Sequence, residues 1–429
     1  MPVPYRTRST WSIIAPLVLA AALVQACASP PAERAPAPET AAPETAAAAP
    51  TADPAASAVQ RSLSFAEKQL AAEVGRIVPG QYPADTEPNG VWATTDSDDW
   101  RCGFFPGMLW QMYERTGDPV WRARAQDWQA PLEPAKTDDS THDVGFIILT
   151  TFGHGFELTG DEAFRATVLT AARTLSTRFT PAVGAIRSWD DIDDTTQYRV
   201  IVDNMMNLEL LFWAAQHGGD PAWADIASRH ARTTARDHVR PDGSTFHVVD
   251  YDQAIGSVTS QGTAQGFADS STWARGQAWA VYGFAMTYRY TRDPQFLGVA
   301  RSAADYWVSH LPADKVPYWD FAVPPDGGEP RDTSAAAIAA AGLLELSEYE
   351  TDGARKQVYL DTAREMIVAL SAPGYLAEGT TNEAILLHGT QNKPGGNFDT
   401  GLVVGDYYLI EALTRYERVA AGRSVLAPR

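Results

Sequence analysis

Two aspartates stand directly before apolar, helix-forming stretches of the chain. Asp143 precedes Val144-Gly145-Phe146, and Asp203 precedes the stretch that begins near Met205. We expect both carboxyl groups to face pockets of low dielectric, where burial raises a carboxyl pKa and the proton is held near neutral pH. Two such carboxyls indicate acid/base chemistry.

The same positions also have a purely structural interpretation. Asp143, Asp203, Asp332 and Asp399 each stand where a helix is expected to begin. An Asp at such a position can cap the helix by accepting bonds from free backbone N–H groups. The apolar residues after Asp143 and Asp203 favour the catalytic interpretation for these two.

Composition argues against several other kinds of chemistry. The formal net charge of −19 argues against affinity for nucleic acid, so an anionic substrate would need a few well-placed cations. Cys27 and Cys102 are too few for a disulfide framework or a thiolate metal site, and the histidines show no HExxH spacing. We therefore expect no metal and no other cofactor. The 13 tryptophans suit stacking on sugar rings, although any one of them could equally pack in the core.

A repeated tripeptide predicts the elements that must position these acids. Thr116-Gly117-Asp118 recurs along the chain, and an aromatic residue follows the Asp of the first four copies three positions later. Gly suits the left-handed position that ends one helix, and Asp suits the N-cap that opens the next. Each copy therefore predicts a turn between two helices. The copies lie at 116–118, 159–161, 218–220, 291–293 and, in degenerate form, 351–353.

An apolar stretch precedes every turn, and a sixth lies near the C-terminus. These stretches are apolar nearly all round, as buried helices are, whereas those after the turns mix charged and apolar residues as surface helices do. We therefore predict an all-α fold, an (α/α)6 barrel of six helical hairpins in a closed ring, with an open solenoid as the main alternative. The inner stretches are 104–113, 145–158, 205–216, 278–290, 335–349 and 401–416.

Inner helices that run the same way place their N-termini at one rim of the ring. Helix N-termini carry partial positive charge, so an anionic group would be favoured there despite the acidic chain. We expect the active site at this rim. The residues at the predicted helix starts are Trp100, Asp143, Asp203, Arg275, Asp332 and Asp399.

The N-terminal segment has the features of an export signal. Arg6 and Arg8 precede an apolar run at 13–24 that is too short to span a bilayer as a stable helix. The run leads to Cys27 through a sequence that resembles the lipobox of bacterial lipoproteins, although Gln25 departs from its usual small residue. We expect export to the cell envelope, with a lipid anchor at Cys27 as the only membrane contact. Secretion without a lipid is the alternative.

These features predict the domain organisation. Residues 1–27 are expected to be a lipoprotein-type signal peptide. Residues 28–58 are mostly Ala, Pro, Glu and Thr and predict a disordered tether, because such a segment cannot bury a core. The catalytic barrel is expected at 59–429.

Several motifs together resemble the unsaturated glucuronyl hydrolases, glycoside hydrolase family 88. The resemblance runs from about residue 95 to residue 420, and any one motif alone would be a weak indication. The motifs are GFFPGMLW at 103–110, HDVGF at 142–146, DNMMN at 203–207, WARGQAW at 273–279 and GDYY at 405–408.

The resemblance implies an activity and two catalytic residues. Members of the family remove a 4,5-unsaturated uronic acid from the non-reducing end of oligosaccharides that lyases produce, by hydrating its vinyl ether. Asp203 matches the general acid/base, which would protonate C4 and then activate water for addition at C5. Asp143 matches the family's second essential carboxylate.

The resemblance also implies polar contacts to the substrate. His142 and His247 match histidines that contact the sugar ring, although His247 could be an ordinary surface residue. Gln265 and Arg275 match groups that contact the uronate. Arg275 is the best candidate to compensate its carboxylate.

Aromatic and loop positions can be carried over in the same way. Trp189 and Trp279 match stacking residues, with core packing as the alternative. Phe105 falls near the family's first stacking Trp, and Trp100 could take over that role. Lys393, in the loop 388–395, could bind a sulfate or a second carboxylate, or be a solvated lysine.

Three alternatives to this activity remain open at the level of sequence. An unsaturated rhamnogalacturonyl hydrolase shares the barrel and the hydration chemistry but lacks the His142-Asp143 pair. A noncatalytic sugar-binding lipoprotein would keep the aromatic residues but would not need two acids with apolar neighbours. A polysaccharide lyase on the same barrel would need a Tyr or His base.

Overall fold

The computed structural model describes residues 54–189, 191–325 and 327–426. The signal peptide predicted at 1–27 and the lipobox at its end lie outside these ranges, as does most of the predicted tether. Among the helices of the described residues, none is long and apolar enough to cross a membrane.

An inner set of helices forms the centre of the described chain. These helices are buried nearly all round, and in α11 (Thr333–Tyr349) every residue from Thr333 to Ser347 is buried. The many alanines of α11 let α9, α12 and α13 pack closely against it. The other inner helices are α2 (Phe104–Thr116), α4 (Val144–Ile148) with the π-helical turn η2 (Leu149–Gly153) and α5 (His154–Thr159), α7 (Asn204–Gln216), α9 (Ala274–Thr291) and α13 (Val403–Ala420).

An outer set of helices covers the inner one. Each outer helix turns an apolar stripe inward, as α8 does with Trp223, Ala227 and Ala231. The outer helices are α1 (Pro54–Glu73), α3 (Pro119–Gln129), α6 (Glu162–Thr177), α8 (Ala222–Asp237), α10 (Pro294–His310) and α12 (Gly353–Leu370), and a 3-10 helix η1 (Ala130–Thr137) follows α3. Helix α1 includes the last five residues assigned to the tether, so the ordered domain begins earlier than predicted. Its buried Ala55 and Ala58 show why: small residues there pack against the barrel instead of remaining in solvent.

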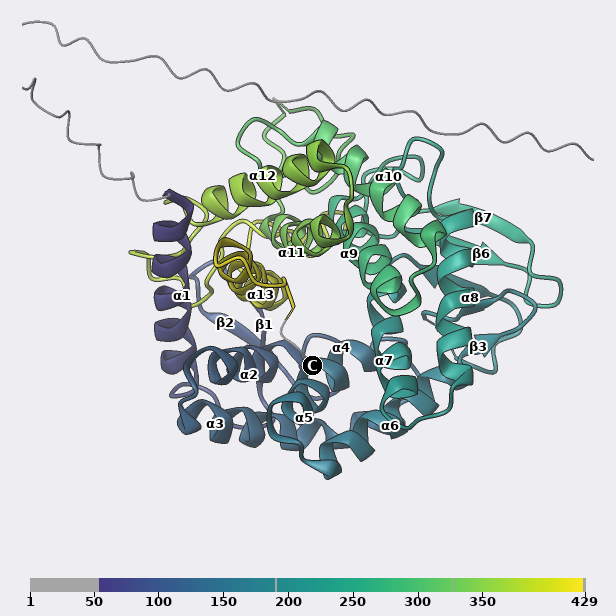
Figure 1. Cartoon of the computed structure of the whole chain (residues 1–429), viewed down its shortest axis with the longest axis horizontal. Coiled ribbons are helices and arrows are strands. Elements are labelled where there is room, and N and C mark those ends of the chain that lie inside the picture. The colour runs from purple at the N-terminus through teal and green to yellow at the C-terminus, as the bar shows by residue number, and fades with distance from the viewer. Residues whose placement is uncertain (1–53, 190, 326, 427–429) are drawn as a thin grey trace, which may run out of the picture. The chain divides into compact units, whose positions relative to one another are not determined.

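The two sets form a closed ring (Figure 1). Successive inner helices contact one another, and the last one, α13, packs against the first, α2. Helix α1 contacts α2, α12 and α13 and so covers the junction between the two ends of the chain. The predicted (α/α)6 barrel is confirmed.

The predicted turns between inner and outer helices are found in the structure. Gly117 ends α2 in the left-handed region at φ 67°, and the Asp118 side chain accepts a hydrogen bond from the Val120 N–H at the start of α3. Asp161 and Asp293 cap α6 and α10 in the same way. The short Asp side chain thus fixes where each of these outer helices begins.

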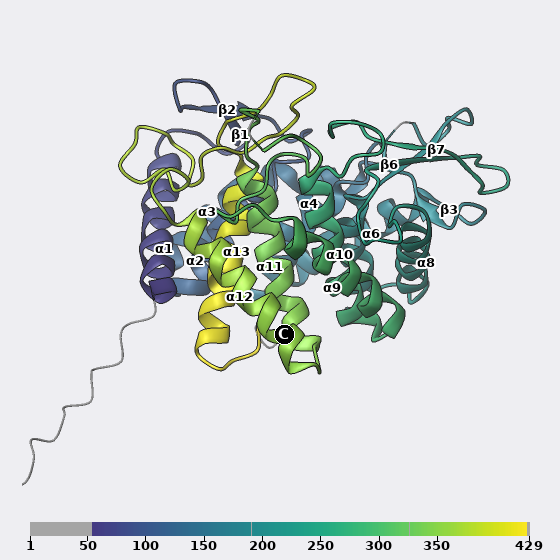
Figure 2. The same ribbon diagram turned by 90° about the horizontal axis from the view of Figure 1, so that it is seen from above.

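Short strands, which the all-α prediction did not include, connect some of the helices. Strands β5 (Tyr198–Ile201), β6 (Val248–Tyr251) and β7 (Val258–Gly262) form an antiparallel sheet. Figure 2 shows β1, β2, β6 and β7 on the same side of the helices, where the inner helices begin. The remaining strands are two pairs, β1 (Tyr82–Thr86) with β2 (Trp92–Thr95) and β3 (Phe179–Thr180) with β4 (Ala185–Ile186).

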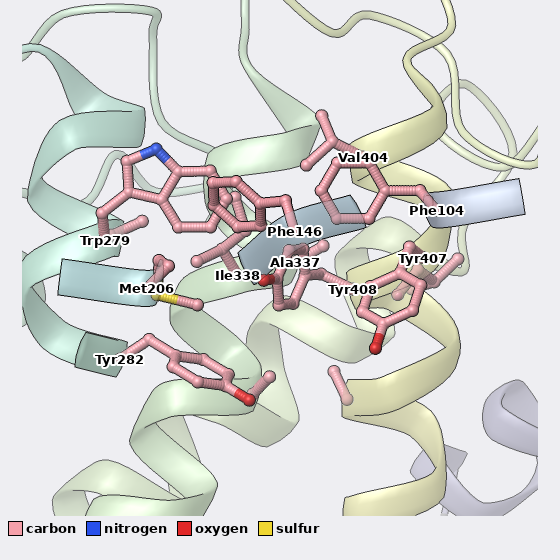
Figure 3. Packing of buried hydrophobic residues seen from close by; sticks show 14 of the residues in the cluster. Phe104, Phe146, Met206, Trp279, Tyr282, Ala337, Ile338, Val404, Tyr407 and Tyr408 are labelled. Carbon is pink, nitrogen blue, oxygen red and sulfur yellow. The ribbon is translucent and has the colours of Figure 1, made fainter. Parts of the chain in front are cut away.

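Aromatic side chains fill the middle of the ring (Figure 3). The Phe146 ring lies 5.4 Å from that of Trp279 and 5.5 Å from that of Phe104, between ring centroids. Trp279 in turn lies 5.5 Å from Tyr408. The barrel is therefore not an open tube, because this layer separates the rim at the helix N-termini from the opposite end.

Candidate active site

Asp203 lies where β5 leads into α7, at the rim where the inner helices begin. It occupies the N-cap position of α7, yet its side chain makes no capping hydrogen bond. The side chain is 15 % exposed, and its buried Oδ2 has no hydrogen-bond partner among the described residues. Burial raises the pKa of Asp203 to about 7, while the charge of Arg275 opposes the rise and that of Asp143 adds to it. Asp203 is therefore not simply a helix cap.

Asp143 occupies the same position at the start of α4 and also makes no capping hydrogen bond. Its side chain is 14 % exposed. Thr141 Oγ1 donates to Oδ2 at 3.2 Å, and Asn207 Nδ2 donates to Oδ1 at 3.4 Å. Burial raises the pKa of Asp143 to about 7, and these two hydrogen bonds limit the rise. Both predicted acids thus change protonation near neutral pH.

The three-stranded sheet places His247 opposite Asp203. Ile201 of β5 pairs with Val248 of β6. At the end of this pairing the Val202 N–H donates to the His247 carbonyl at 3.0 Å. Asp203 and His247, which are far apart in sequence, are therefore held side by side by adjacent strands.

The contacts of His247 fix its tautomer. Its Nδ1 accepts a hydrogen bond from the Ala264 N–H at 3.2 Å, so the neutral ring carries its proton on Nε2. Nε2 lies 3.7 Å from Asp203 Oδ2 and is buried, with no hydrogen-bond partner within residues 54–189, 191–325 and 327–426. Burial, together with the charge of Arg275, lowers the pKa of His247 well below its ordinary value. The ring is therefore a neutral N–H donor at neutral pH.

His142 stands in the same relation to Asp143. Asn207 Oδ1 accepts from the Phe146 N–H at 2.9 Å, which directs Asn207 Nδ2 toward His142 Nδ1 at 3.3 Å. The neutral His142 ring thus carries its proton on Nε2, 3.6 Å from Asp143 Oδ1. Burial lowers the pKa of His142 to about 3. Each acid therefore faces the Nε2–H of a buried, neutral histidine.

Several buried polar atoms around these acids have no hydrogen-bond partner within the described part of the chain. Folded proteins leave few such atoms, so a group of them at one rim is expected to face a ligand or water. The atoms are Asp203 Oδ2, His142 Nε2, His247 Nε2, Trp279 Nε1 and Gln391 Oε1.

Arg275 lies close to Asp203 but is held by other groups. Its Nη1 donates to Asp332 Oδ2 at 3.1 Å and to the Thr390 carbonyl at 2.6 Å, and its Nη2 donates to the Gln391 carbonyl at 2.6 Å. The side chain is buried, and its guanidinium lies 4.6 Å from the centre of a Trp273 ring. Its role as a direct partner of the substrate carboxylate therefore stays a prediction, whereas the structure shows that it fastens the loop around residue 390.

Gln265 joins the same loop. Its Nε2 donates to the Gln391 carbonyl at 2.7 Å, so one carbonyl receives both Gln265 and Arg275. The structure thus brings these two predicted binding residues together across the rim.

Trp189 and Trp100 are partly exposed at this rim. The Trp189 ring lies 6.1 Å from that of His247 in an edge-to-face arrangement. The Trp100 ring lies 5.5 Å from Phe146 and 5.7 Å from Phe104. Both retain surface on which a sugar ring could stack.

Phe105 and Trp279, unlike Trp189 and Trp100, are buried. Phe105 is 1 % exposed, and its ring packs on Trp128 of α3 at 5.8 Å, so it faces the outer helices and not the rim. The assignment of Phe105 to a stacking position is therefore corrected. Trp279 is fully buried between Phe146 and Tyr408, with only its unpaired Nε1 to offer a ligand.

Lys393 and Asp399 lie on the late loop. The Lys393 ammonium sits 4.1 Å from the centre of the Phe398 ring, and binding of a sulfate by Lys393 stays a prediction. Asp399 is not a helix cap: it is exposed, with φ of 60°, and contacts His388 Nδ1 at 2.5 Å. Helix α13 begins later, at Val403, after Leu402.

Sequence reasoning assigned no role to Asn207 and predicted only a helix cap for Asp332. Asn207 links His142, Asp143 and the start of α4. It lies four residues after Asp203, so both residues are on one face of α7. This spacing is the signal in the sequence that could have identified Asn207 as a residue of the site. Asp332 caps α11 and accepts from Arg275 as well. The predicted cap is present, whereas the ion pair was not visible because Arg275 is distant from Asp332 in sequence. Within the described ranges, no group of three or more His, Cys, Asp or Glu side chains is arranged to hold a metal ion.

Comparison with known proteins identifies a family and several relatives that this chain resembles. The model of the family described as Glycosyl Hydrolase Family 88 matches residues 75–427. The unsaturated glucuronyl hydrolase of Formosa agariphila is 44 % identical over 328 residues, which cover 75 % of this chain and 81 % of that protein.

Two further similarities extend over most of the chain. The unsaturated chondroitin disaccharide hydrolase of Streptococcus pyogenes is 31 % identical, over 83 % of this chain and 91 % of its own length. A crystal structure of an unsaturated glucuronyl hydrolase specific for heparin superposes with a TM-score of 0.81 at 38 % identity, covering 85 % of this chain and 98 % of that one.

Proposed function

The chain belongs to glycosyl hydrolase family 88, and from this premise we propose that it removes a 4,5-unsaturated uronic acid from the non-reducing end of oligosaccharides produced by lyases. The observation that carries the proposal is the pair of rim acids, each opposite a neutral histidine. The unpartnered Oδ2 of Asp203 is the group best placed to exchange a proton with a ligand.

The proposed reaction is the hydration of a vinyl ether. Asp203 donates its proton to C4 of the unsaturated ring, and the positive charge that develops at C5 is shared with the ring oxygen. The Asp203 carboxylate then takes a proton from water as the water oxygen bonds to C5. The product is a hemiketal, which opens and releases the remaining sugar, so one water is consumed for each bond that is broken.

The surroundings of Asp203 support this double role. A pKa of about 7 leaves the group able both to donate and to accept a proton at neutral pH. Asp143, held by Thr141 and Asn207, is suited to orient the water or the substrate. The Nε2–H groups of His142 and His247 can donate to sugar hydroxyls, because neither has a hydrogen-bond partner in the part of the chain that the structure describes.

The activity is tested directly with an unsaturated disaccharide prepared with a lyase. Turnover removes the C4–C5 double bond, so the absorbance of the unsaturated chromophore should fall with time. A matched control is Asp161→Asn, because Asp161 caps the outer helix α6 at the turn after α5, at the opposite end of that inner segment from the rim. Unchanged absorbance with several such disaccharides would contradict the proposal.

We also propose that the protein is exported and anchored by a lipid at Cys27. The sequence at 1–27 supports this proposal. Cells that express the full chain should hold the protein in the membrane fraction, and Cys27→Ser should move it to the soluble fraction. Wild-type protein found wholly in the soluble fraction would contradict the anchor.

A further inference from the structure

A cavity lies inside the ring, on the other side of the aromatic layer from the acids. Its volume is about 220 Å³, and neither Asp143 nor Asp203 lines it. Phe146, Met206 and Tyr408, which Figure 3 labels among the buried residues in the middle of the ring, are part of its lining. Much of the rest of its wall comes from the middle and C-terminal parts of inner helices, with Glu114 from α2 as one example, and Val425 and Leu426 after α13 complete it. The cavity therefore opens toward the end of the barrel opposite the active site.

We propose that this cavity binds a small organic cation with a primary ammonium group. The first reason is its charge. Four glutamates line the wall against two arginines, so carboxylates exceed guanidinium groups by two among the lining residues. The glutamates are Glu114, Glu157, Glu209 and Glu411, and the arginines are Arg415 and Arg418.

The arginines are already held within the wall. Arg415 Nη2 donates to Glu411 Oε1 at 2.5 Å, and its Nη1 lies 3.2 Å from Glu345 behind the wall. Arg418 donates to the carbonyls of Ser424 and Leu426 near the C-terminus. The glutamates have partners too: Glu411 pairs with Arg415, and Glu209 with Arg289, which is not part of the lining. Glu157 and Glu114 lie beside His217 and His154. The carboxylates of the wall still outnumber its guanidinium groups, and both guanidinium groups are engaged, so the wall favours a cation over an anion such as a uronate.

The second and independent reason is Gln111. This residue is only 8 % exposed and lines the cavity, and its buried Oε1 has no hydrogen-bond partner among the described residues. A buried amide oxygen without a donor is costly, so it is expected to accept a bond from something that enters the cavity. An ammonium group supplies such a donor and is attracted by the surrounding carboxylates as well.

The third reason is the aromatic part of the wall. Tyr282, Tyr407 and Trp213 line the same cavity, and aromatic faces attract ammonium groups. Carboxylates, an unpaired amide oxygen and aromatic rings together suit a short aliphatic chain that carries ammonium ends. The cavity is thus complementary in charge to a class of ligand that differs from the anionic sugar of the active site.

The experiment uses 1,5-diaminopentane as the probe and 1,5-pentanediol, of similar length but uncharged, as its control. Both are titrated into the full catalytic chain at fixed ionic strength, with isothermal calorimetry and the melting temperature as readouts. We expect the diamine to release or absorb heat with saturation and to raise Tm, and the diol to do neither. Absence of saturable binding of the diamine would overturn the proposal.

Variants locate the binding. Gln111→Leu should weaken diamine binding at least about tenfold, because the ammonium loses an acceptor. It should leave Tm without ligand unchanged or higher, because it removes an unpaired buried amide. Glu114→Gln changes a more exposed part of the wall and should also weaken diamine binding. This second variant keeps the test decisive if Gln111→Leu does not fold. Diamine binding that is unaffected by both variants, or that competes with the sugar substrate, would overturn the assignment.

Discussion

At the scale of single residues, the two acids share a raised pKa but differ in their contacts. Asp143 receives hydrogen bonds from Thr141 and Asn207, whereas Asp203 Oδ2 receives none from the described residues. A carboxyl oxygen that no donor holds is better able to pass its proton to a substrate. The structure thus supports the division of roles in which Asp203 moves the proton and Asp143 orients.

Asp203→Asn tests this division. The amide keeps the shape of the side chain but cannot donate an acidic proton, so we expect kcat to fall at least about a hundredfold. Binding should survive, because the Nε2–H of His247 and the rest of the rim are unchanged. Kinetics and Tm are measured on the variant and on Asp161→Asn, which should keep both. A near-normal kcat in Asp203→Asn would refute the assignment whatever its stability.

The pKa of about 7 for Asp203 predicts a pH dependence of turnover. The group must be protonated to begin the reaction, so kcat should decrease as the pH rises above about 7. Asp143→Asn removes a negative charge that raises the pKa of Asp203, so whatever activity remains should decline at a lower pH than in the wild type. Since removal of that charge lowers the pKa, we expect the profile to shift toward acid. A profile that does not move would contradict the interaction.

The stability of the fold should depend on pH through the same two carboxyl groups. Asp143 and Asp203 have higher pKa values in the folded chain than in the unfolded chain, so the folded state holds more protons. Their contribution is complete below the unfolded pKa of about 4 and is lost as the pH rises through about 7. We therefore expect Tm to decrease between about pH 4 and pH 7 and to level off above this range, and to decrease less in Asp203→Asn. An equal decrease in both proteins would show that Asp203 does not contribute.

At the scale of elements, the start of α4 must approach α7 very closely. A Cβ on Gly145 would lie 2.5 Å from Asn207 Oδ1 and 2.9 Å from Asn207 Cα. Gly145→Ala should therefore separate the two helices and displace Asp143 from Asp203, lowering both Tm and kcat. Gly298→Ala is the matched control, because a Cβ on Gly298 in α10 would meet nothing within 4 Å. The control should be stabilised by up to about 1 kcal/mol, as alanine favours helix.

The loop around residue 390 depends on Arg275. Arg275→Lys replaces two well-separated donors by one ammonium and should release the carbonyls of Thr390 and Gln391. We expect KM to rise about tenfold or more, with faster backbone hydrogen exchange at 388–395. Lys393→Ala tests whether a rise in KM comes from the displaced loop or from loss of a direct contact between Lys393 and the substrate. If KM rises equally in that variant while exchange is unchanged, Lys393 itself contacts the substrate.

Much of this arrangement could be predicted from sequence because its signals are local. The turn at Gly117-Asp118 needs only a left-handed residue and an N-cap, and both are visible in the chain. The orientation of Phe105 was not predictable, because Phe104 and Phe105 are both apolar in a helix buried nearly all round, and only tertiary packing decides which ring faces the rim. Asp399 misled for a related reason: the last inner helix begins after Leu402, with no polar cap to mark it.

The strands were missed because they are short and their effect is not local. Strands β5 and β6 bring His247 to Asp203 through a pairing of Ile201 with Val248. The sequence contains the two residues but not their distance. The partners of Arg275, which lie at 332 and at 390–391, are invisible for the same reason.

At the scale of the whole molecule, stability depends on how α1 covers the junction of the ring. Leu63 of α1 is buried in the main core, whereas Val358 of α12 is exposed. We expect Leu63→Ala to lower the free energy of unfolding by about 2–5 kcal/mol and Val358→Ala to change it little. Chemical denaturation measures both. Equal, small effects would show that α1 is not part of the cooperative unit.

The closure of the ring also determines when the domain can finish folding. Helix α1 is synthesised first, but its neighbours α12 and α13 are synthesised last, and α2 likewise waits for α13. A ribosome that has produced all but the final helix therefore holds a chain in which both α1 and α2 still lack their contacts with α13. The nascent protein remains incompletely folded until its last residues emerge, which leaves the whole period of translation available for a translocation machinery or a chaperone to bind it.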